Sequence, residues 1–361
     1  FTAEKIFPQG GRTRLVVKHM LPQYTHTEEL VSRFRDEARL GLVLRHSNIV
    51  RVLEYWEIEG HHYMVMEEVD GFDLAEVVVA CRRSKREIPQ EVAAYFLHGI
   101  ASALAYMADA TSPDGHNLEL VHRDISPSNI LVSRDGVIKL IDFGVAKAAE
   151  REARTRTGYF VGKYSYMSPE QIRGEAVDIR SDLFALGVVG YQLLAGRSPF
   201  QGTSDFETMN LVLTRDPEPL ERVRRDVHPM LSRAIGRCMA KDLDDRYDHP
   251  IKLVEDFHRY FYVAVDRPPS LRAQEFLSEL GLITQIERDE EDPNATVPLG
   301  KAPTSTVQLK VPSAPSEPTL DPARITANMP TPDSETEPGA PKRRPATARD
   351  AAVAAARKAL E

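Results

Sequence analysis

The proline-rich stretch that begins at Asp289 constrains the fold of this chain most, because it separates residues that can build a core from residues that cannot. Residues 289–361 hold 12 of the 25 prolines and lack aromatic side chains almost entirely. A segment of this composition buries too little apolar surface to offset the entropy that ordering costs. We therefore expect a disordered proline-rich tail, whose alanine-rich end, residues 348–361, favours a short helix that would be marginal in isolation.

Composition and charge argue against several classes of protein. Hydrophobic residues make up 42% of the chain and charged residues 28%, as in ordinary globular proteins. The formal net charge of -8 argues against a nucleic-acid binder that works through a broad basic field. The sequence shows neither a signal peptide nor a run of about 18 apolar residues. We expect a cytoplasmic protein without a membrane segment, in which Cys81 and Cys238 are reduced packing residues.

The pattern of apolar residues divides the part before the tail into two regions. Strand patterns dominate at first, with one helical pattern at residues 27–45, whereas the pattern is mostly helical from Gly71 onward. Two short strand patterns around Asp135-Gly136 predict a hairpin within the helical region. The predicted fold is α+β, with a small antiparallel β lobe (residues 1–69), a larger helical lobe (residues 70–265) and a further helical segment (residues 266–288).

The stretch "VHRDISPSNIL", residues 121–131, carries candidate chemistry. Asp124 and Asn129 lie in a predicted loop after a long helix, and Asp142 opens "DFG" just after the predicted hairpin. Carboxylate and amide oxygens are ligands that Mg²⁺ prefers, together with phosphates. Three such side chains on adjacent loops predict magnesium-phosphate chemistry, in which the protein mainly positions groups and neutralises charge.

Five motifs occur in the order and spacing of a known family. They are "VVK", the glutamate of "FRDEAR", "HRDISPSN", "DFG" and "MSPE". Together they resemble the signature set of the protein kinases, and the whole pattern is similar to bacterial eukaryotic-type serine/threonine kinases, myxobacterial members in particular. The resemblance implies a two-lobed protein-kinase fold, ATP and Mg²⁺ as cofactors, and protein substrates that bear serine or threonine. The proline-rich tail is then a candidate site for partner proteins.

The resemblance also implies roles for individual residues. Lys18 would hold the α- and β-phosphates of ATP, and Glu37 would orient it. Asp124 would be the catalytic base that accepts the proton of the substrate hydroxyl. Asn129 and Asp142 would each hold a magnesium ion.

Further residues are expected around adenine. The expected ATP-contacting residues are Val16, Met66, Glu67, Val69 and Leu131. Among these, Met66 would be the gatekeeper, and the backbone of Glu67 and Val69 would hydrogen-bond adenine.

Other residues have structural interpretations. Asp182 resembles the structural aspartate of the family, and Arg246 resembles the arginine that pairs with Glu170. His122 is expected to pack in the core and not to act as a base. His61-His62 is interpreted as a turn between strands, since no further ligands lie at metal-binding spacing.

The chain departs from the family pattern at several positions. Phe1 falls just after the expected glycine-rich phosphate loop, so we expect an N-terminally truncated fragment that binds ATP weakly. "QGG", residues 9–11, lies too close to Lys18 to replace that loop and is interpreted as a hairpin turn. Val16 stands where the family usually has alanine, and Gly41 stands where it usually has a bulky side chain.

A further departure concerns two residues that are reciprocally exchanged. Ser126 stands where the family has a lysine that contacts the γ-phosphate. Lys163 stands where the family has a threonine that bonds that lysine. We hypothesise that Lys163 neutralises the transferring phosphoryl group with Ser126 as its hydrogen-bond partner; the alternative is that Lys163 only contacts the peptide substrate.

The same segment suggests regulation. Arg123 precedes the catalytic aspartate, and in kinases of that type this arginine pairs with a phosphorylated residue. Thr155 and Thr157 are the candidate acceptors, with Thr157 preferred. A phosphate there would accept bonds from Arg123 and order the segment.

Two further interpretations stay open. The chain could be a pseudokinase whose lobes and tail serve as a binding scaffold, as Ser126 and the missing loop suggest. A kinase of small molecules is disfavoured, because "MSPEQI" resembles peptide-docking machinery. Catalysis is favoured over a scaffold role, because a pure scaffold has no chemical need to retain Lys18, Glu37, Asp124, Asn129 and Asp142.

Overall fold

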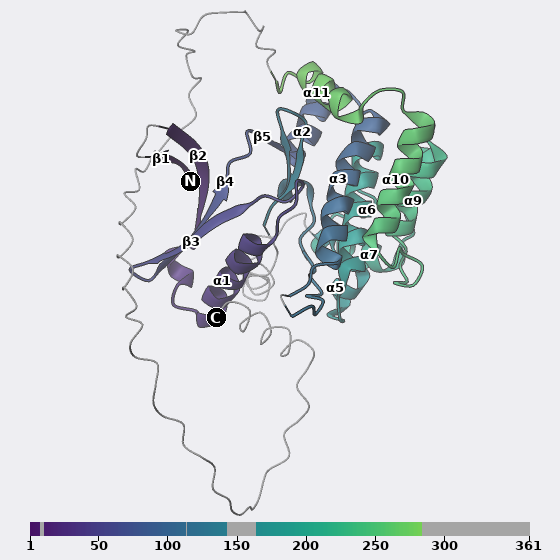
Figure 1. Cartoon of the computed structure of the whole chain (residues 1–361). Helices are drawn as coiled ribbons and strands as arrows, with labels where there is room; N and C mark the ends of the chain where they lie inside the picture. Colours follow the sequence, from purple (N-terminus) through teal and green to yellow (C-terminus); the bar gives the residue numbers. More distant parts are fainter. Residues whose placement is uncertain (8–10, 113, 143–163, 284–361) are drawn as a thin grey trace, which may run out of the picture.

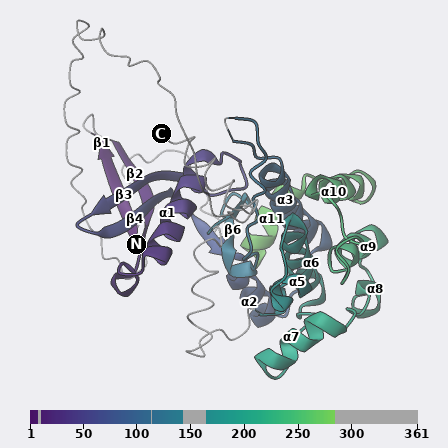
Figure 2. The same cartoon turned by 90° about the horizontal axis from the view of Figure 1, so that it is seen from below.

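The chain folds into two lobes that differ in secondary structure (Figures 1 and 2). The computed structural model describes residues 1–7, 11–112, 114–142 and 164–283. A four-stranded antiparallel sheet and one long helix form the first lobe, and helices dominate the second. The predicted two-lobed α+β fold is therefore confirmed, whereas the expectations for the tail fall outside the described residues.

The sheet of the first lobe positions side chains on two distinct faces. Its strands are β1 (Thr2–Phe7), β2 (Gly11–His19), β3 (Val52–Ile58) and β4 (His61–Glu67). They follow the order β1-β2-β4-β3, and each neighbouring pair is antiparallel. Because side chains alternate along a strand, Leu15 and Val17 pack on one face while Lys18 lies on the other. Helix α1 (Glu28–Val43) packs with its apolar stripe against the face that carries Lys18.

The hairpin between β3 and β4 corrects one expectation from the sequence. Its turn lies at Glu59 and Gly60, whose φ angles are 51° and 75°. Two successive positive φ angles form the tight turn that suits the twist of a hairpin. The turn expected at His61-His62 is therefore wrong, because both residues belong to β4 and His62 is buried.

The turn expected at "QGG" falls mostly outside the described residues. Strands β1 and β2 pair antiparallel with Phe7 opposite Gly11, and Gly11 itself begins β2.

Gly41 allows α1 to approach the sheet unusually closely. A Cβ atom at this position would lie 2.2 Å from Cγ2 of Val52 on β3, closer than packed atoms can approach. The side chain of Val52 is itself buried and stiff, because it is β-branched. The absence of a side chain at Gly41 thus sets the separation between α1 and β3.

Gly41→Ala is expected to lower the free energy of unfolding by about 1–3 kcal/mol, because the new methyl group must displace Val52 or the helix. A matched control is Gly236→Ala in α9, where a Cβ atom would meet nothing within 4 Å. That control is expected to be neutral or to stabilise by about 0.4–1 kcal/mol. Urea unfolding of both variants measures the difference, and equal effects would contradict the steric explanation.

The second lobe is built around two helices that are buried on nearly all sides. Its helices are α2 (Leu74–Ser84), α3 (Gln90–Ala108), α5 (Pro169–Arg173), α6 (Ile179–Ala195), α7 (Asp205–Thr214), α8 (Leu220–Val223), α9 (Pro229–Cys238), α10 (Pro250–Ala264) and α11 (Pro269–Glu279). The central pair is α3 and α6, which contact each other and the surrounding α9 and α10. Their high apolar content on every face explains this central position.

Local sequence signals define where the helices near the site begin and end. Asp73 caps α2 and Ser168 caps α5, each in a reciprocal capping box with the side chain three residues later. Gly174 and Gly196 follow α5 and α6 with φ angles of 70° and 69°, which glycine adopts without strain. These caps fix one or both ends of the helices α2, α5 and α6.

A small second sheet connects the lobes. It consists of β5 (Gly71–Asp73), β6 (Ile130–Ser133) and β7 (Ile138–Leu140), and β6 and β7 form the predicted hairpin. The backbone of Leu140 exchanges hydrogen bonds of 2.8 and 2.9 Å with Asn48 and Val50, which follow α1. This contact ties the helix of the first lobe to the hairpin of the second.

Helix α11 extends the helical lobe beyond α10 and packs against α3. It buries Ala273, Phe276 and Leu277. The side chain of Gln274 donates a hydrogen bond to the carbonyl of Asp135 in the β6–β7 turn. Within the described residues, no helix is both long enough and apolar enough to cross a membrane.

Candidate active site

A buried charge cluster lies where α1 faces the strand β2. Nζ of Lys18 donates to Oε1 of Glu37 at 2.6 Å and to Oδ1 of Asp142 at 2.7 Å. Burial alone would lower the pKa of Lys18, but Asp142 and Glu37 outweigh burial and raise that pKa to about 12. A lysine that is fully charged and held between two carboxylates is positioned to bind a phosphate.

The loop that follows α3 holds a second group of polar side chains. Nδ2 of Asn129 donates to the carbonyl of Asp124 at 2.6 Å and to its carboxylate Oδ2 at 2.7 Å. Both side chains are buried, at 3% and 5% exposed. Because the amide nitrogen is used in these bonds, the amide oxygen of Asn129 is the atom suited to a metal.

Asp182 on α6 holds the backbone of this loop in place. Its two carboxylate oxygens accept hydrogen bonds from the backbone N–H of His122 at 2.6 Å and of Arg123 at 2.7 Å. Burial raises the pKa of Asp182 to about 7, although these bonds favour the charged form. Arg123 has a φ of 69°, a conformation that is costly for a residue with a side chain. The bonds from Asp182 help to maintain it.

The residue that opens "DFG" has an unusual backbone as well. Asp142 has a φ of 58°, and its side chain reaches Lys18 across the boundary between the lobes. His122 is fully buried and its Nε2 lies 3.1 Å from the carbonyl of Ile141. The packing role expected for His122 therefore agrees with its position, whereas Phe143 lies outside the described residues.

The residues expected around adenine line the boundary between the lobes. Val16 lies on the same face of β2 as Lys18 and is paired with Met66 of β4. Leu131 is partly exposed between the buried Ile130 and Val132, so its side chain points away from the core of the second lobe.

The segment that follows β4 leaves backbone groups available. The side chain of Glu67 points away from the expected adenine position, because it accepts bonds from Lys139 Nζ and the backbone N–H of Arg51. Within the described residues, neither backbone group of Val69 has a hydrogen-bond partner. An unpaired backbone donor and acceptor at this point fit the recognition of a planar base.

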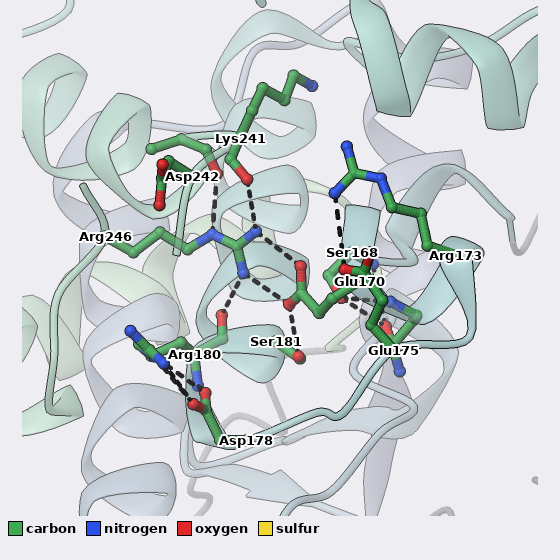
Figure 3. Close-up of polar contacts among 12 residues, drawn as sticks. Ser168, Glu170, Arg173, Glu175, Asp178, Arg180, Ser181, Lys241, Asp242 and Arg246 are labelled. Carbon is green, nitrogen blue, oxygen red and sulfur yellow. Dashed lines mark hydrogen bonds and ion pairs between the residues drawn. The ribbon is translucent and has the colours of Figure 1, made fainter. Parts of the chain in front are cut away.

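Glu170 and Arg246 form a buried ion pair in the helical lobe (Figure 3). Two guanidinium nitrogens of Arg246 donate to the two carboxylate oxygens at 2.8 and 2.9 Å. The side chains are 0% and 2% exposed. Burial would raise the pKa of Glu170, but the bonds from Arg246 and Ser181 lower it to about 2. The expected pairing of these two residues is thus present.

This pair predicts a loss of stability in acid. The pKa of Glu170 falls from its ordinary value of 4.5 in the unfolded chain to about 2 in the folded one. Its contribution is therefore complete above pH 4.5 and is lost as the pH falls toward 2. Between pH 7 and pH 3 the pair is expected to lose about 2 kcal/mol of stability. Urea unfolding at several pH values measures this, and a Glu170→Gln variant with the same pH slope would contradict it.

Several expected residues lie outside the described part of the chain. These are Lys163, Thr155 and Thr157, so the exchange with Ser126 and the phosphorylation of the segment stay predictions. Ser126 itself is buried, and its Oγ lies 3.2 Å from Oγ of Ser128.

One contact of the site was missed by the sequence analysis. Nε2 of Gln171 donates to the carbonyl of Arg123, which joins α5 to the loop that carries Asp124. The sequence did contain a signal for the start of α5, because serine at position 168 with glutamine three residues later is the pattern of a capping box. The box fixes the start of α5 and thereby the place of Gln171.

Comparison with known proteins identifies a matching family. Residues 5–257, more than half of the chain, match the family model described as "Protein kinase domain". A "Tyrosine-protein kinase MasK" of Myxococcus xanthus is 39% identical over 247 residues, which cover 68% of this chain and 38% of that protein. A "Serine/threonine-protein kinase PrkC" of Bacillus subtilis is 34% identical over 234 residues, which cover 65% and 34%. The chain thus spans well under half the length of these relatives.

A solved structure supports the same fold. The kinase domain of PknI from Mycobacterium tuberculosis superposes with a TM-score of 0.52 and is 25% identical in sequence. The match covers 70% of this chain and 86% of that one.

Proposed function

Because this chain belongs to the protein kinase domain family, we propose that it transfers the γ-phosphate of ATP to serine or threonine hydroxyls of proteins. The observation that carries this proposal is the position of Lys18, bonded at once to Glu37 and Asp142. The bond to Glu37 fixes the ammonium group of Lys18, and the bond to Asp142 shows that this group reaches the residue proposed to hold magnesium, so one phosphate could contact both.

The acidic and amide side chains fit a magnesium ion. Mg²⁺ is usually bound by one or two carboxylates together with phosphate oxygens and water. The amide oxygen of Asn129 would hold one ion and Asp142 a second, and these ions would neutralise charge on the phosphates when bound. Within the described residues no group of three or more histidine, cysteine or carboxylate side chains could bind a metal by itself. This agrees with an ion that is shared with a nucleotide.

Asp124 is proposed as the base that accepts the proton of the substrate hydroxyl. Its carboxylate is oriented by Asn129 through a bond of 2.7 Å, and its loop is held by Asp182. ATP would lie between the lobes with adenine between Val16 and Leu131, next to the gatekeeper Met66. The backbone of Glu67 and Val69 would bond the base.

Two further parts of the proposal concern the segment that contains Lys163. Lys163 would supply the positive charge that the usual lysine at Ser126 cannot supply. Phosphorylation of Thr157 or Thr155 would create an anion for Arg123 and activate the protein. Wild-type turnover in Lys163→Ala would exclude the first idea, and active protein with both threonines unmodified would exclude the second.

The acceptor amino acid has one specific alternative. PrkC, at 34% identity, and other similar bacterial proteins carry the name of serine/threonine kinases. MasK, at 39% identity, carries the name of a tyrosine-protein kinase. Phosphoamino-acid analysis of the labelled product decides between them. A pseudokinase scaffold remains the alternative for a chain that transfers no phosphate.

The organisation around the catalytic part also belongs to the proposal. We assign residues 1–69 and 70–265 to the two lobes, residues 266–288 to a helical extension and residues 289–361 to a tail that could bind partner proteins. A cytoplasmic location is part of the same proposal.

The experiment that tests the activity is transfer of labelled phosphate from ATP with magnesium to a panel of protein substrates. We expect transfer by the wild-type chain and its loss in Asp124→Ala. Circular dichroism and unfolding curves check that the variant is folded. Equal incorporation by both proteins, or none by the folded wild type in a form that includes a glycine-rich loop, would reject the proposal.

A further inference from the structure

A second pocket lies on the helical lobe, at a distance from the phosphate-binding residues. Its volume is about 200 Å³. It is formed by the end of α2 with the segment that follows it, the end of α6, and the end of α8 with Arg224 after it. None of its lining residues takes part in the proposed transfer.

The floor and the rim of this pocket differ in chemistry. The floor is apolar and is made by Val78, Cys81, Ile88, Leu193, Leu194 and Val223. Burial raises the pKa of the Cys81 thiol to about 11, so this residue adds no negative charge at neutral pH. The rim carries the cationic side chains Arg82, Lys85, Arg86 and Arg224 and one carboxylate, Glu87.

Two of the rim cations have no acidic partner among the residues that the structure describes. Arg86 pairs with Glu279, and Arg224 pairs with Asp226 and Glu87. By contrast, Arg82 and Lys85 are exposed and contact no carboxylate within the described part of the chain. Arg82 donates only to the carbonyl of Gly196, at 3.3 Å.

The surplus of positive charge is local. The stretch "RRSKR", residues 82–86, carries four cations and no anion in a chain whose net charge is -8. Such a patch attracts negatively charged groups that also offer apolar surface to the floor. A nucleic acid would need a longer basic track than one helix end provides.

A hydrogen bond connects this pocket to the candidate active site. The hydroxyl of Tyr166 donates to Oε1 of Gln192, which lines the pocket. Tyr166 also lines a small cleft with Asp124, Ser126 and Gln171. A chain that lies across Tyr166 would therefore reach the pocket and the catalytic loop at the same time.

We propose that this pocket docks an acidic segment of the protein substrate, with an apolar side chain on the floor and carboxylates on Arg82 and Lys85. This inference rests on the proposed function, because it assigns a class of substrate to the same site. Substrates that place an acidic and apolar segment next to their acceptor hydroxyl would be preferred.

The first test measures docking without catalysis. A labelled peptide that is rich in glutamate, contains one leucine and lacks hydroxyl side chains is compared with a peptide that has glutamine in place of every glutamate. We expect the full chain to bind the acidic peptide about tenfold more tightly, with a preference that weakens as salt is added. The Arg82→Gln/Lys85→Gln double variant should lose about that factor, because each exposed charge pair is worth up to about 1 kcal/mol.

A matched control removes the same charge elsewhere. Lys252 and Arg259 on α10 are exposed and are far in sequence from the pocket. The Lys252→Gln/Arg259→Gln double variant should bind the acidic peptide as the wild type does. An equal loss of affinity for the acidic peptide in both double variants would mean that net charge alone governs binding. Unchanged affinity in both would mean that the pocket does not bind the peptide. Either result overturns the inference.

The second test separates docking from the proposed activity. For an acidic protein substrate, the Arg82→Gln/Lys85→Gln variant should raise KM about tenfold with kcat unchanged, while a neutral substrate should show no change. If the wild type binds the acidic peptide but transfers no phosphate, the proposed function fails while docking stands. If binding appears only after the chain's own acidic residues Glu287 and 289–292 are neutralised, the pocket belongs to that segment and the assignment to a substrate is wrong.

Discussion

Replacing Arg246 with methionine is expected to lower the free energy of unfolding by about 3–5 kcal/mol, because Glu170 would be left as a buried carboxylate without its counter-charge. Arg246 is the centre of the network in Figure 3. Besides both oxygens of Glu170, its guanidinium reaches the carbonyls of Ala240 and Arg180 at 2.8 and 3.1 Å. Methionine can fill the space but cannot satisfy any of these acceptors.

Urea unfolding monitored by circular dichroism measures this loss. Arg180→Met is the matched control, because Arg180 makes ion pairs with Asp178 and Asp244 but lies nearer the surface. Exposed pairs of this kind contribute about 0–1 kcal/mol. A loss below about 1 kcal/mol for Arg246→Met would show that Glu170 becomes protonated or hydrated at no cost, which contradicts the buried pair as a structural requirement.

The double variant Glu170→Leu/Arg246→Met adds a sharper test. It removes both charges, so it should be more stable than Arg246→Met alone, although the carbonyls that Arg246 satisfied remain unpaired. A double variant that is less stable than the single one would mean that the ion pair contributes mainly through Glu170 and Ser181, whose side chains are hydrogen-bonded.

Lys18→Met is expected to reduce kcat/KM for phosphate transfer by about 10²–10³-fold, the usual effect of removing one positioned charge from a site of charge development. Glu37→Gln should cost less, because Asp142 still holds Nζ of Lys18 at 2.7 Å. Steady-state kinetics with varied ATP measures both. Lys5→Met is the control, since Lys5 is a half-exposed lysine on the neighbouring strand that pairs with Glu54.

An unchanged kcat/KM in Lys18→Met would remove Lys18 from the proposed site. A Glu37→Gln variant that is as impaired as Lys18→Met would show that Asp142 alone cannot hold the lysine. Both outcomes require that the variants remain folded, which the same unfolding measurement as above establishes.

Short motifs in the sequence predicted where several polar side chains lie, whereas their roles stay predictions. Asp124 and Asn129 contact each other before the predicted hairpin, Asn129 at the end of a short 3-10 helix (Pro127–Asn129), and Lys18 meets Glu37 as expected. The hairpin at Asp135-Gly136 followed from a strong turn signal. These features depend on local patterns, so they can be recognised without knowing the tertiary structure.

Other features depend on contacts that no local pattern records. The sequence showed glycine at position 41, where the resembled family usually has a bulky side chain. It did not show that Val52 fills the space beside it. The turn expected at His61-His62 lies two residues earlier, at Glu59 and Gly60; Gly60 was the better signal, since glycine readily adopts the positive φ that the turn needs. The pocket beside α2 combines residues separated by more than a hundred positions, so only the fold brings them together.

The bonds from Asp182 have a consequence for the time at which activity can arise during protein synthesis. Every candidate catalytic side chain that the structure describes precedes α6 in the sequence, so all of them are synthesised before Asp182. Yet the loop of His122 and Arg123 is held by a carboxylate 60 and 59 positions further along. A nascent chain without α6 would carry the reactive groups without their geometry.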